Sequence, residues 1–323
     1  MSALRVNLVY EGFDSNWSNS FTQLLTRGLE REGVLVHLIN LAFLPHGTCV
    51  TRIKNAPRCD IWYLASVHEW MLETCAETRI PIVAHSHGGI ETGAFCDVAK
   101  NVAGSLNISA KLHLLAGLTV NSQSHSDQIS NFYGYDHAEV VGFPMDFDRY
   151  PHALQLNGER DLICVPGRLE PDKQPTLVAS ALAPFKDRVV FTTPVKKDSG
   201  THELYDHLVR SGYRVLTGCR GAEYLEVLSR SLVVFSASLA DTLNLSVVEG
   251  ILCGANPVVP NIAVFKEYVF SERYKPYDIQ GIRNCVYKAL TANSVEHGIS
   301  HLNYPIVGKR VAGILKKIAG ERR

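Results

Sequence analysis

Several features that mark common protein classes are missing from this sequence. None of its eight cysteines is spaced C-x-x-C with another, which argues against a structural zinc site and favours reduced thiols. Its 32 Lys and Arg residues balance 32 Asp and Glu residues, so a uniformly basic nucleic-acid-binding surface is excluded. No hydrophobic run approaches the roughly 20 residues that cross a bilayer, and we expect no transmembrane segment.

Motifs of other classes are absent as well. No G-x-G-x-x-G follows the first predicted strand, where the chain has EGFDSN, so we expect no nicotinamide site. No H-E-x-x-H spacing occurs among the 13 histidines, and no D-x-D pair follows a strand. The start of the chain lacks the apolar core of a signal peptide. We therefore expect a cytoplasmic protein without a metal or cofactor, with association to a membrane surface left open.

Hydrophobic patterning predicts two successive runs of alternating strands and helices. The 323 residues suit two domains of roughly 150 residues each. The predicted strands are apolar along most of their length, which is typical of parallel strands buried on both faces. They are expected at 4–10, 34–41, 60–66, 80–84, 117–122 and 138–142, and then at 161–166, 188–193, 213–217, 231–236 and 256–260.

Amphipathic segments between the strands predict helices and complete a strand–helix–strand order. They are expected at 18–32, around 98–116, and at 175–183, 202–211, 222–230, 245–253, 278–291 and 307–319. Residues 143–159, rich in Asp, Pro and Asn, are interpreted as a linker. We therefore expect an N-terminal Rossmann-like domain (1–150), a C-terminal Rossmann-like domain (151–305) and a terminal helix (306–323) that would pack back toward the first.

The first segment with chemical content is VPGRLEPDKQP, Val165 to Pro175. A predicted strand ends there, and the turn presents Arg168 and Lys173 before a helix that starts with proline. Cations at a strand end suit a phosphate, because Arg offers a bidentate fork and Lys a point charge. Residues 156–323 carry 22 basic and 17 acidic residues against 10 and 15 in 1–155, which also favours an anionic ligand in the second half. The alternative is two solvated cations beside Glu170 and Asp172.

The second segment runs from Phe235 to Pro260. A predicted strand ends in small residues, Asp241 follows in a loop, and a helix starts near Leu245 with Glu249 in its early turns. The free N–H groups of a helix start bind anions, and a nearby carboxylate can accept hydrogen bonds from ribose hydroxyls. The alternative for Glu249 is simple complementation of the helix dipole.

Together the two segments resemble the retaining glycosyltransferases of family 4, which have the GT-B fold. That family carries G-R-L…K after the first strand of its C-terminal domain, matched here by Gly167, Arg168, Leu169 and Lys173. Its motif E-x-F-G-x-x-x-x-E-A-x-A-x-G-x-P-V is similar to residues 241–258, which have one more residue between Gly254 and Pro257. Asp241 replaces the usual Glu, and Asn244 replaces the usual Gly.

The resemblance extends less closely into the first half. PIVAHSHG (81–88) is similar to the family strand that ends in a His near the donor sugar, with His87 the better match and His85 the second. The first loop has Gly12 alone where the family usually has a Gly-rich pair. NSQSHS (121–126) and VGFPMDFDRY (141–150) resemble the stretches that lead out of the first domain.

The resemblance implies a role for each matched residue. Arg168 and Lys173 would neutralise the leaving diphosphate, Asp241 would contact the donor sugar, and His87 would reach it from the opposite domain. These four are the candidate catalytic residues. Glu249 would hold the ribose, and Gly12 would let the first loop approach the donor. The candidate donor-binding residues are Gly12, Arg168, Lys173, Gly218, Asn244, Leu245 and Glu249.

The implied fold is α/β GT-B, two Rossmann-like domains facing a central cleft. The implied function is a retaining, metal-independent hexosyltransferase that moves a sugar from a nucleotide diphosphate sugar, with a UDP-sugar favoured. The donor is a co-substrate, and no further cofactor is expected. The acceptor is unidentified and is a glycan, a lipid, a small molecule or a modified nucleic acid. Alternatives are a phage-type DNA-base glycosyltransferase of the same fold, a nucleotide-sugar 2-epimerase and a non-catalytic nucleotide-sugar binder.

Overall fold

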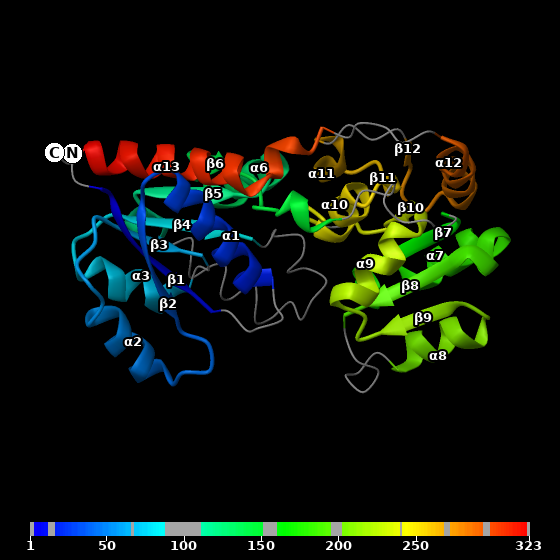
Figure 1. The fold of residues 1–323 in the computed structure, drawn as a ribbon, viewed down its shortest axis with the longest axis horizontal. Coiled ribbons are helices and arrows are strands. Elements are labelled where there is room, and N and C mark those ends of the chain that lie inside the picture. The colour runs from blue at the N-terminus through cyan, green and yellow to red at the C-terminus, as the bar shows by residue number, and fades with distance from the viewer. Residues whose placement is uncertain are drawn as a thin grey trace. The chain divides into compact units, whose positions relative to one another are not determined.

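The computed structural model contains two compact units (Figure 1). Unit 1 comprises residues 1–146 and 300–323, and unit 2 comprises residues 147–299. The structure describes residues 3–11, 17–65, 68–87, 111–150, 160–194, 202–239, 241–267, 272–292 and 298–321. Only the backbone is described at residues 17–19 and 202.

Unit 1 is built on a six-stranded, wholly parallel sheet in the order β2-β1-β3-β4-β5-β6. Its inner strands are buried along almost their whole length, as their apolar composition predicts. The strands are β1 (Arg5–Tyr10), β2 (Leu35–Asn40), β3 (Ile61–Leu64), β4 (Ile82–Ser86), β5 (Gly117–Val120) and β6 (Ala138–Val140).

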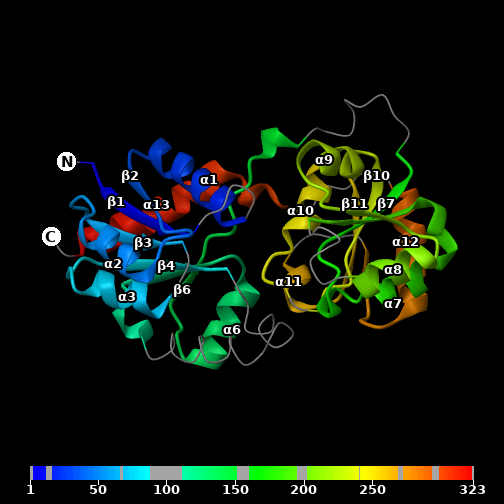
Figure 2. The same cartoon turned by 90° about the horizontal axis from the view of Figure 1, so that it is seen from below.

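Helices cover both faces of this sheet (Figures 1 and 2). One face packs on α2 (His46–Lys54), α3 (Glu69–Ala76) and α6 (Gln123–Tyr133), which share a hydrophobic cluster with the strands. The other face carries α1 (Trp17–Arg31) and the last helix, α13 (Tyr304–Gly320), side by side. A Cβ built on Gly308 of α13 would lie 2.4 Å from the backbone of Gly28 in α1. The two helices therefore approach each other at facing glycines.

Unit 2 repeats the plan with a second six-stranded parallel sheet in the order β12-β11-β10-β7-β8-β9. Each inner strand is again largely buried. The strands are β7 (Leu162–Pro166), β8 (Val189–Thr193), β9 (Arg214–Thr217), β10 (Ser231–Phe235), β11 (Asn256–Pro260) and β12 (Glu272–Tyr274).

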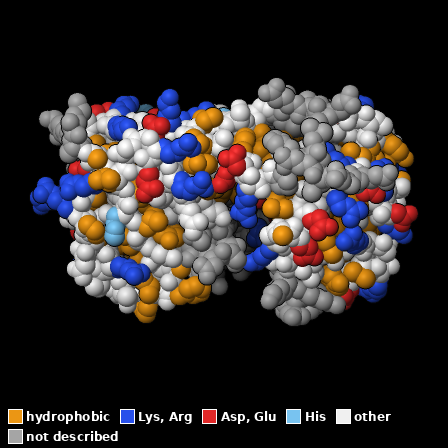
Figure 3. Space-filling view, viewed as in Figure 1, with side chains coloured by type: hydrophobic (Ala, Val, Ile, Leu, Met, Phe, Trp, Pro, Cys, Tyr) orange, Lys and Arg blue, Asp and Glu red, His pale blue; other side chains and the backbone are white. Residues whose placement is uncertain are grey.

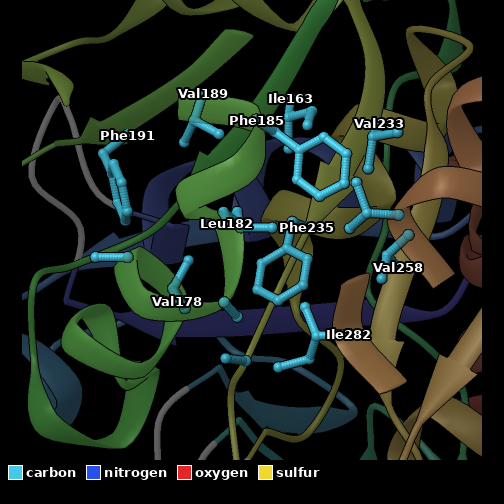
Figure 4. Close-up of a cluster of buried hydrophobic side chains, with 14 of the residues drawn as sticks. Ile163, Val178, Leu182, Phe185, Val189, Phe191, Val233, Phe235, Val258 and Ile282 are labelled. Atoms are coloured by element: carbon cyan, nitrogen blue, oxygen red, sulfur yellow. The ribbon is translucent and has the colours of Figure 1, made fainter. Parts of the chain in front are cut away.

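The core of unit 2 lies between the sheet and three helices on one face (Figure 4). These are α7 (Pro175–Leu182), α8 (His202–Arg210) and α12 (Ile279–Thr291); Phe235 from β10 and Ile282 from α12 meet in this cluster. Helices α9 (Gly221–Ser229) and α10 (Leu245–Leu252) cover the other face, and the short α11 (Ala263–Lys266) follows β11.

Every strand predicted from the sequence is confirmed, and most bounds agree within two residues. The parallel order is also confirmed. Sequence analysis missed β12 and four helices, α2, α3, α6 and α11. The helix expected around 98–116 falls mostly outside the described residues. The first boundary between units lies at Asp146 rather than 150, and the seven described cysteines are buried free thiols.

Net charge does not distinguish the two units. Unit 1 has 15 Lys and Arg residues against 15 Asp and Glu residues, and unit 2 has 17 of each. The excess of positive charge in the second half of the sequence resides in residues 300–323, which belong to unit 1. On the face shown in Figure 3, charges of both signs are interspersed over both units. An anion site in unit 2 must therefore come from local geometry.

No helix among the described residues is long and apolar enough to cross a membrane. The basic residues of α13 lie on its exposed side, and Lys316 Nζ donates to the carbonyl of Glu32 at 2.9 Å.

Candidate functional site

The candidate residues of unit 2 cluster at the ends of two neighbouring strands whose following connections run in opposite directions. Strands β7 and β10 lie side by side, but the chain leaves β7 toward β8 and leaves β10 toward β11, on opposite sides. In parallel sheets such a switch point opens a crevice at the carboxyl ends of the strands, where ligands bind. The loop after β7 carries residues 167–174, and the loop after β10 carries residues 236–244.

Backbone and side-chain hydrogen bonds join these two loops. Gln174 Nε2 donates to the carbonyl of Ala237 at 3.1 Å, and the Leu239 N–H donates to the carbonyl of Asp172 at 3.2 Å. Gln174 adopts a left-handed backbone (φ 49°), which turns the chain directly into Pro175 of α7. The two motifs found about seventy residues apart in the sequence therefore form one structure.

Lys173 lies at the centre of the joined loops. Its Nζ is 2.8 Å from Ser238 Oγ, 3.0 Å from Asp241 Oδ2 and 3.1 Å from Asp172 Oδ2. Burial lowers the pKa of Lys173, but the two carboxylates and their hydrogen bonds outweigh it, so its pKa is raised and the ammonium stays charged. An ammonium has three donors; two of them hydrogen-bond Ser238 and Asp241, and Asp172 adds an ion pair.

Asn244 shapes the backbone of the second motif at the start of α10. Its backbone is left-handed (φ 56°), the conformation for which the family uses glycine and which Asn tolerates better than most residues. Its Oδ1 caps α10 by accepting from Val247 N at 3.2 Å. Its Nδ2 donates to Asp241 Oδ2 at 2.8 Å and to Ser236 Oγ at 3.0 Å. Asn244 therefore begins the helix and orients Asp241.

The start of α10 adds backbone donors to the same edge. The N–H groups of Leu245 and Ser246 precede the first intrahelical hydrogen bonds, and no acceptor lies against them among the described residues. Such groups attract anions. The cations do not give the site a positive charge, because Lys173 contacts two carboxylates and Arg168, half exposed, pairs with Glu170 at 3.1 Å.

Glu249 is held by two tyrosines that sequence analysis did not identify. Its Oε1 accepts from Tyr150 at 3.0 Å, and its Oε2 accepts from Tyr224 at 3.1 Å. Burial raises the pKa of Glu249, although both phenol hydrogen bonds act in the opposite direction. Each carboxylate oxygen keeps capacity for a further hydrogen bond. Both tyrosine contacts fall within unit 2, and neither lies in the motif of Glu249.

Gly218 follows β9 at the same edge of the sheet, with a left-handed backbone (φ 66°) that suits glycine. Strand β8 separates β9 from β7, so Gly218 does not adjoin Lys173 in the sheet. The helix that begins just after it, α9, carries Tyr224. Gly218 is therefore linked to the cluster only indirectly, through Tyr224 of α9 and its hydrogen bond to Glu249.

The candidate histidines of unit 1 lie at the carboxyl end of β4. His85 is fully buried, and its two ring nitrogens lie 3.0 Å from Thr119 Oγ1 and 3.0 Å from Asn121 Oδ1. His87 follows the strand, with Nε2 2.8 Å from the carbonyl of Ala65 and its ring 4.4 Å from that of Phe21. His85 is thus a satisfied core residue, whereas His87 is at the edge where ligands of parallel sheets bind.

Both imidazoles are neutral at ordinary pH. Burial lowers the pKa of His85 to about 3 despite the hydrogen bond to Asn121. Burial and the neighbouring His85 lower the pKa of His87 well below its usual value. A neutral imidazole hydrogen-bonds a hydroxyl without adding charge.

Unit 1 has its own switch point, between β1 and β3. Glu11 follows β1, and its Oε2 lies 3.3 Å from Nε2 of His68, in the loop after β3. The hydrogen bond to His68 lowers the pKa of Glu11. Sequence analysis did not identify this pair. The neighbouring candidate, Gly12, lies outside the described residues. Within the described part of the chain, no cluster of three or more His, Cys, Asp or Glu could hold a metal ion.

The sequence matches no family model and no curated protein. The structure, in contrast, resembles several solved structures over its whole length. Anabaena HepE, solved with UDP and glucose, is 16% identical with a TM-score of 0.66, covering 99% of this chain and 98% of its own. Sucrose-phosphate synthase from Thermosynechococcus elongatus is 13% identical with a TM-score of 0.70, covering 99% and 97%.

A UDP-forming trehalose-phosphate synthase from Burkholderia xenovorans is 12% identical with a TM-score of 0.71, covering 98% of this chain and 100% of its own. Likeness at such identities establishes architecture and leaves activity to be argued from the site. Two parallel six-stranded sheets with flanking helices, matched end to end by these structures, are the GT-B fold, and the fold predicted from the resemblance is confirmed.

Proposed function

We propose that this protein is a retaining, metal-independent glycosyltransferase that uses a nucleotide diphosphate sugar. The observation that carries the proposal is the cluster at the switch point of unit 2. There Lys173, Asp241 and the capped start of α10 come together from two loops, and Glu249 lies in the same helix. Full-length likeness to structures with the GT-B fold supports it.

The proposed division of roles follows from the chemistry of glycosyl transfer. Positive charge develops on the sugar, and negative charge develops on the departing diphosphate. Lys173, Arg168 and the N–H groups at Leu245 would receive the diphosphate, since fixed donors aimed at developing charge give the largest catalytic contribution. Glu249 would accept from the ribose hydroxyls, and Asp241 from hydroxyls of the sugar. His87 would offer a neutral hydrogen bond to the sugar.

A uridine nucleotide is the proposed donor class. Among the similar structures, HepE was solved with UDP and glucose, and one trehalose-phosphate synthase is described as UDP-forming. A thermal-shift comparison of UDP-, GDP- and ADP-sugars tests the base, because a ligand at 100 times its dissociation constant stabilises a protein by about 2.7 kcal/mol. We expect the largest shift with a UDP-sugar.

The decisive experiment measures UDP release with and without acceptors. Glycans, lipids, small molecules and glycosyl-modified or hydroxymethylated DNA are offered in turn, in excess EDTA. Transfer requires UDP release that depends on an acceptor and a product with the anomeric configuration of the donor, seen in its proton coupling constant. UDP released equally without acceptor, with a 2-epimerised sugar, would identify an epimerase instead. Activity lost in EDTA and restored by Mn²⁺ would contradict metal independence.

Two variants separate the roles within the site. Glu249→Gln should chiefly raise KM for the donor, because the ribose contact is made equally in ground and transition states. Asp241→Asn should lower kcat by about ten- to a thousandfold, the range for a lost contact to developing charge. Unchanged kcat in Asp241→Asn would remove Asp241 from the sugar site.

A further inference from the structure

Asp172 is a buried carboxylate that the roles above leave unassigned. Its side chain is 1% exposed, and its Oδ2 lies 3.1 Å from Lys173 Nζ. Neither Oδ1 nor Oδ2 has a hydrogen-bond partner among the described residues, so its contact with Lys173 is an ion pair. A buried carboxylate is stable in charged form only beside a cation, so Asp172 depends on Lys173.

The backbone of Asp172 is tied to the second loop of the cluster. The backbone carbonyl of Asp172 accepts from Leu239 N at 3.2 Å, which fixes this residue to the loop that carries Ser238 and Asp241. The Asp172 backbone is therefore tied to this loop, and its side chain is buried beside it. Asp241 is more exposed than Asp172, at 19% against 1% of the side chain, and it belongs to the loop before α10. Of the two carboxylates, Asp172 is the more deeply buried.

The charge of the cluster has a consequence for an anionic ligand. Lys173 contributes one positive charge, and Asp172 and Asp241 contribute two negative charges within 3.1 Å of it. Lys173 already hydrogen-bonds Ser238 and Asp241 and forms an ion pair with Asp172, so a diphosphate must compete with these contacts for the ammonium. The three side chains together therefore carry a formal charge of −1 before a ligand binds.

We infer that Asp172 is a positioning residue of the donor site: it anchors the Lys173 ammonium and cancels part of its charge, and so limits how tightly the site holds a nucleoside diphosphate. The inference rests on the proposed function for the identity of the ligand. The anchoring of Lys173 is a property of the free protein, so that part of the inference is independent of the proposed function. A site that holds the diphosphate less tightly releases it sooner after transfer.

The anchoring is tested without any ligand. Asp172→Asn keeps the shape and an oxygen acceptor but removes the charge, so Lys173 should lose its proton more readily. Peptide-level mass spectrometry after acetic anhydride treatment should show Lys173 modified at least about threefold faster than in the wild type. Glu226→Gln, an exposed carboxylate of the same unit, is the matched control and should leave the rate unchanged. An unchanged rate in Asp172→Asn overturns the inference.

The effect on affinity is tested by calorimetry with UDP and with uridine. Removing one negative charge near the diphosphate should tighten UDP binding by about tenfold, which is about 1.4 kcal/mol, and leave uridine binding unchanged. Asp172→Asn that binds both ligands with wild-type affinity contradicts the limiting role. Equal changes for both ligands, with a lowered melting temperature, would show a purely structural role and also overturn it.

The two proposals fail in different ways. A wild type that binds neither UDP nor a UDP-sugar removes the proposed function and the limiting role together, while the acylation rates still decide the anchoring of Lys173. A wild type that binds UDP, with Asp172→Asn equal to Glu226→Gln in both assays, removes this inference alone.

Discussion

The two units have the same sheet plan and opposite chemistry at the carboxyl edges of their strands. In unit 1 the carboxyl end of β4 holds His87, next to the core residue His85 of the strand, and burial keeps both imidazoles neutral. In unit 2 the edge between β7 and β10 holds a charged cluster, in which Lys173 contacts two carboxylates. Each unit is neutral as a whole, so the difference is made by a few side chains at one edge.

Under the proposed function, this difference would let one architecture serve two parts of the donor. Neutral hydrogen-bonding groups bind hydroxyls without competing for charge, which suits a sugar. Preorganised charges and helix N–H groups respond to charge that develops on a diphosphate. The parallel sheet supplies only the location, because every strand delivers its following loop to the same edge. Four predictions test this contrast.

The largest effect is expected at the charged edge. Lys173→Ala should raise the dissociation constant for UDP by about thirtyfold or more, because truncating one partner of a buried charge cluster costs about 2–5 kcal/mol and leaves two carboxylates facing the diphosphate. Uridine should bind almost as before. Calorimetry with both ligands measures this, and the exposed Lys186→Ala serves as the control. Equal losses for UDP and uridine would contradict the diphosphate role.

The next effect concerns the helix that brings positive charge to unit 1. Gly308→Ala should lower the free energy of unfolding of unit 1 by about 1–3 kcal/mol, because its Cβ would lie 2.4 Å from the backbone of Gly28. Gly313→Ala, in the same helix, has nothing within 4 Å and should stabilise by up to about 1 kcal/mol. All three tryptophans, Trp17, Trp62 and Trp70, belong to unit 1, so their fluorescence during urea unfolding reports on this unit.

Acid should destabilise unit 1 through its neutral imidazoles. The pKa of His85 is about 3 in the folded protein against an ordinary 6.5, so the unfolded chain takes up the proton first. Stability is therefore lost as pH falls from about 6.5 toward 3, by about 2 kcal/mol per such histidine between pH 7 and pH 5. Tryptophan-detected urea titrations at the two pH values measure the slope.

His85→Gln supplies the test of that slope. The variant should weaken the pH dependence even if it lowers stability at every pH. His37→Gln, at an exposed position of the same unit, is the control. A slope that His85→Gln leaves unchanged would show that this histidine does not couple protons to folding.

The smallest effect concerns the tyrosines around Glu249. Tyr224→Phe removes one of the two hydroxyls that orient this carboxylate and should raise KM for the donor about two- to tenfold, with kcat unchanged, since a hydrogen bond of this kind contributes about 0.5–1.5 kcal/mol. Steady-state kinetics with varied donor measure it, and Tyr205→Phe in α8 is the control. A fall in kcat instead would place Tyr224 in the chemical step.

Local sequence patterns were sufficient to predict most of the strands and the two loops of the cluster. Apolar runs predicted every inner strand, because strands buried on both faces must be apolar throughout. The G-R-L…K and D-x-x-N…E segments identified the two loops of the cluster, because strand ends, helix starts and capping residues are encoded within a few neighbouring positions. Asn244 shows this well: its left-handed backbone and its cap are both local properties.

Properties that join distant segments were decided only by the tertiary structure. The terminal helix crosses back to unit 1 through the close approach of Gly308 and Gly28, and this removes the charge asymmetry that the linear sequence suggested. Tyr150 and Tyr224 reach Glu249 from outside its motif. The hydrogen bonds of Lys173 to Ser238 and Asp241 depend on two loops meeting at one switch point. Sequence patterns record short-range preferences, whereas these contacts depend on how the packed sheet brings separate loops together.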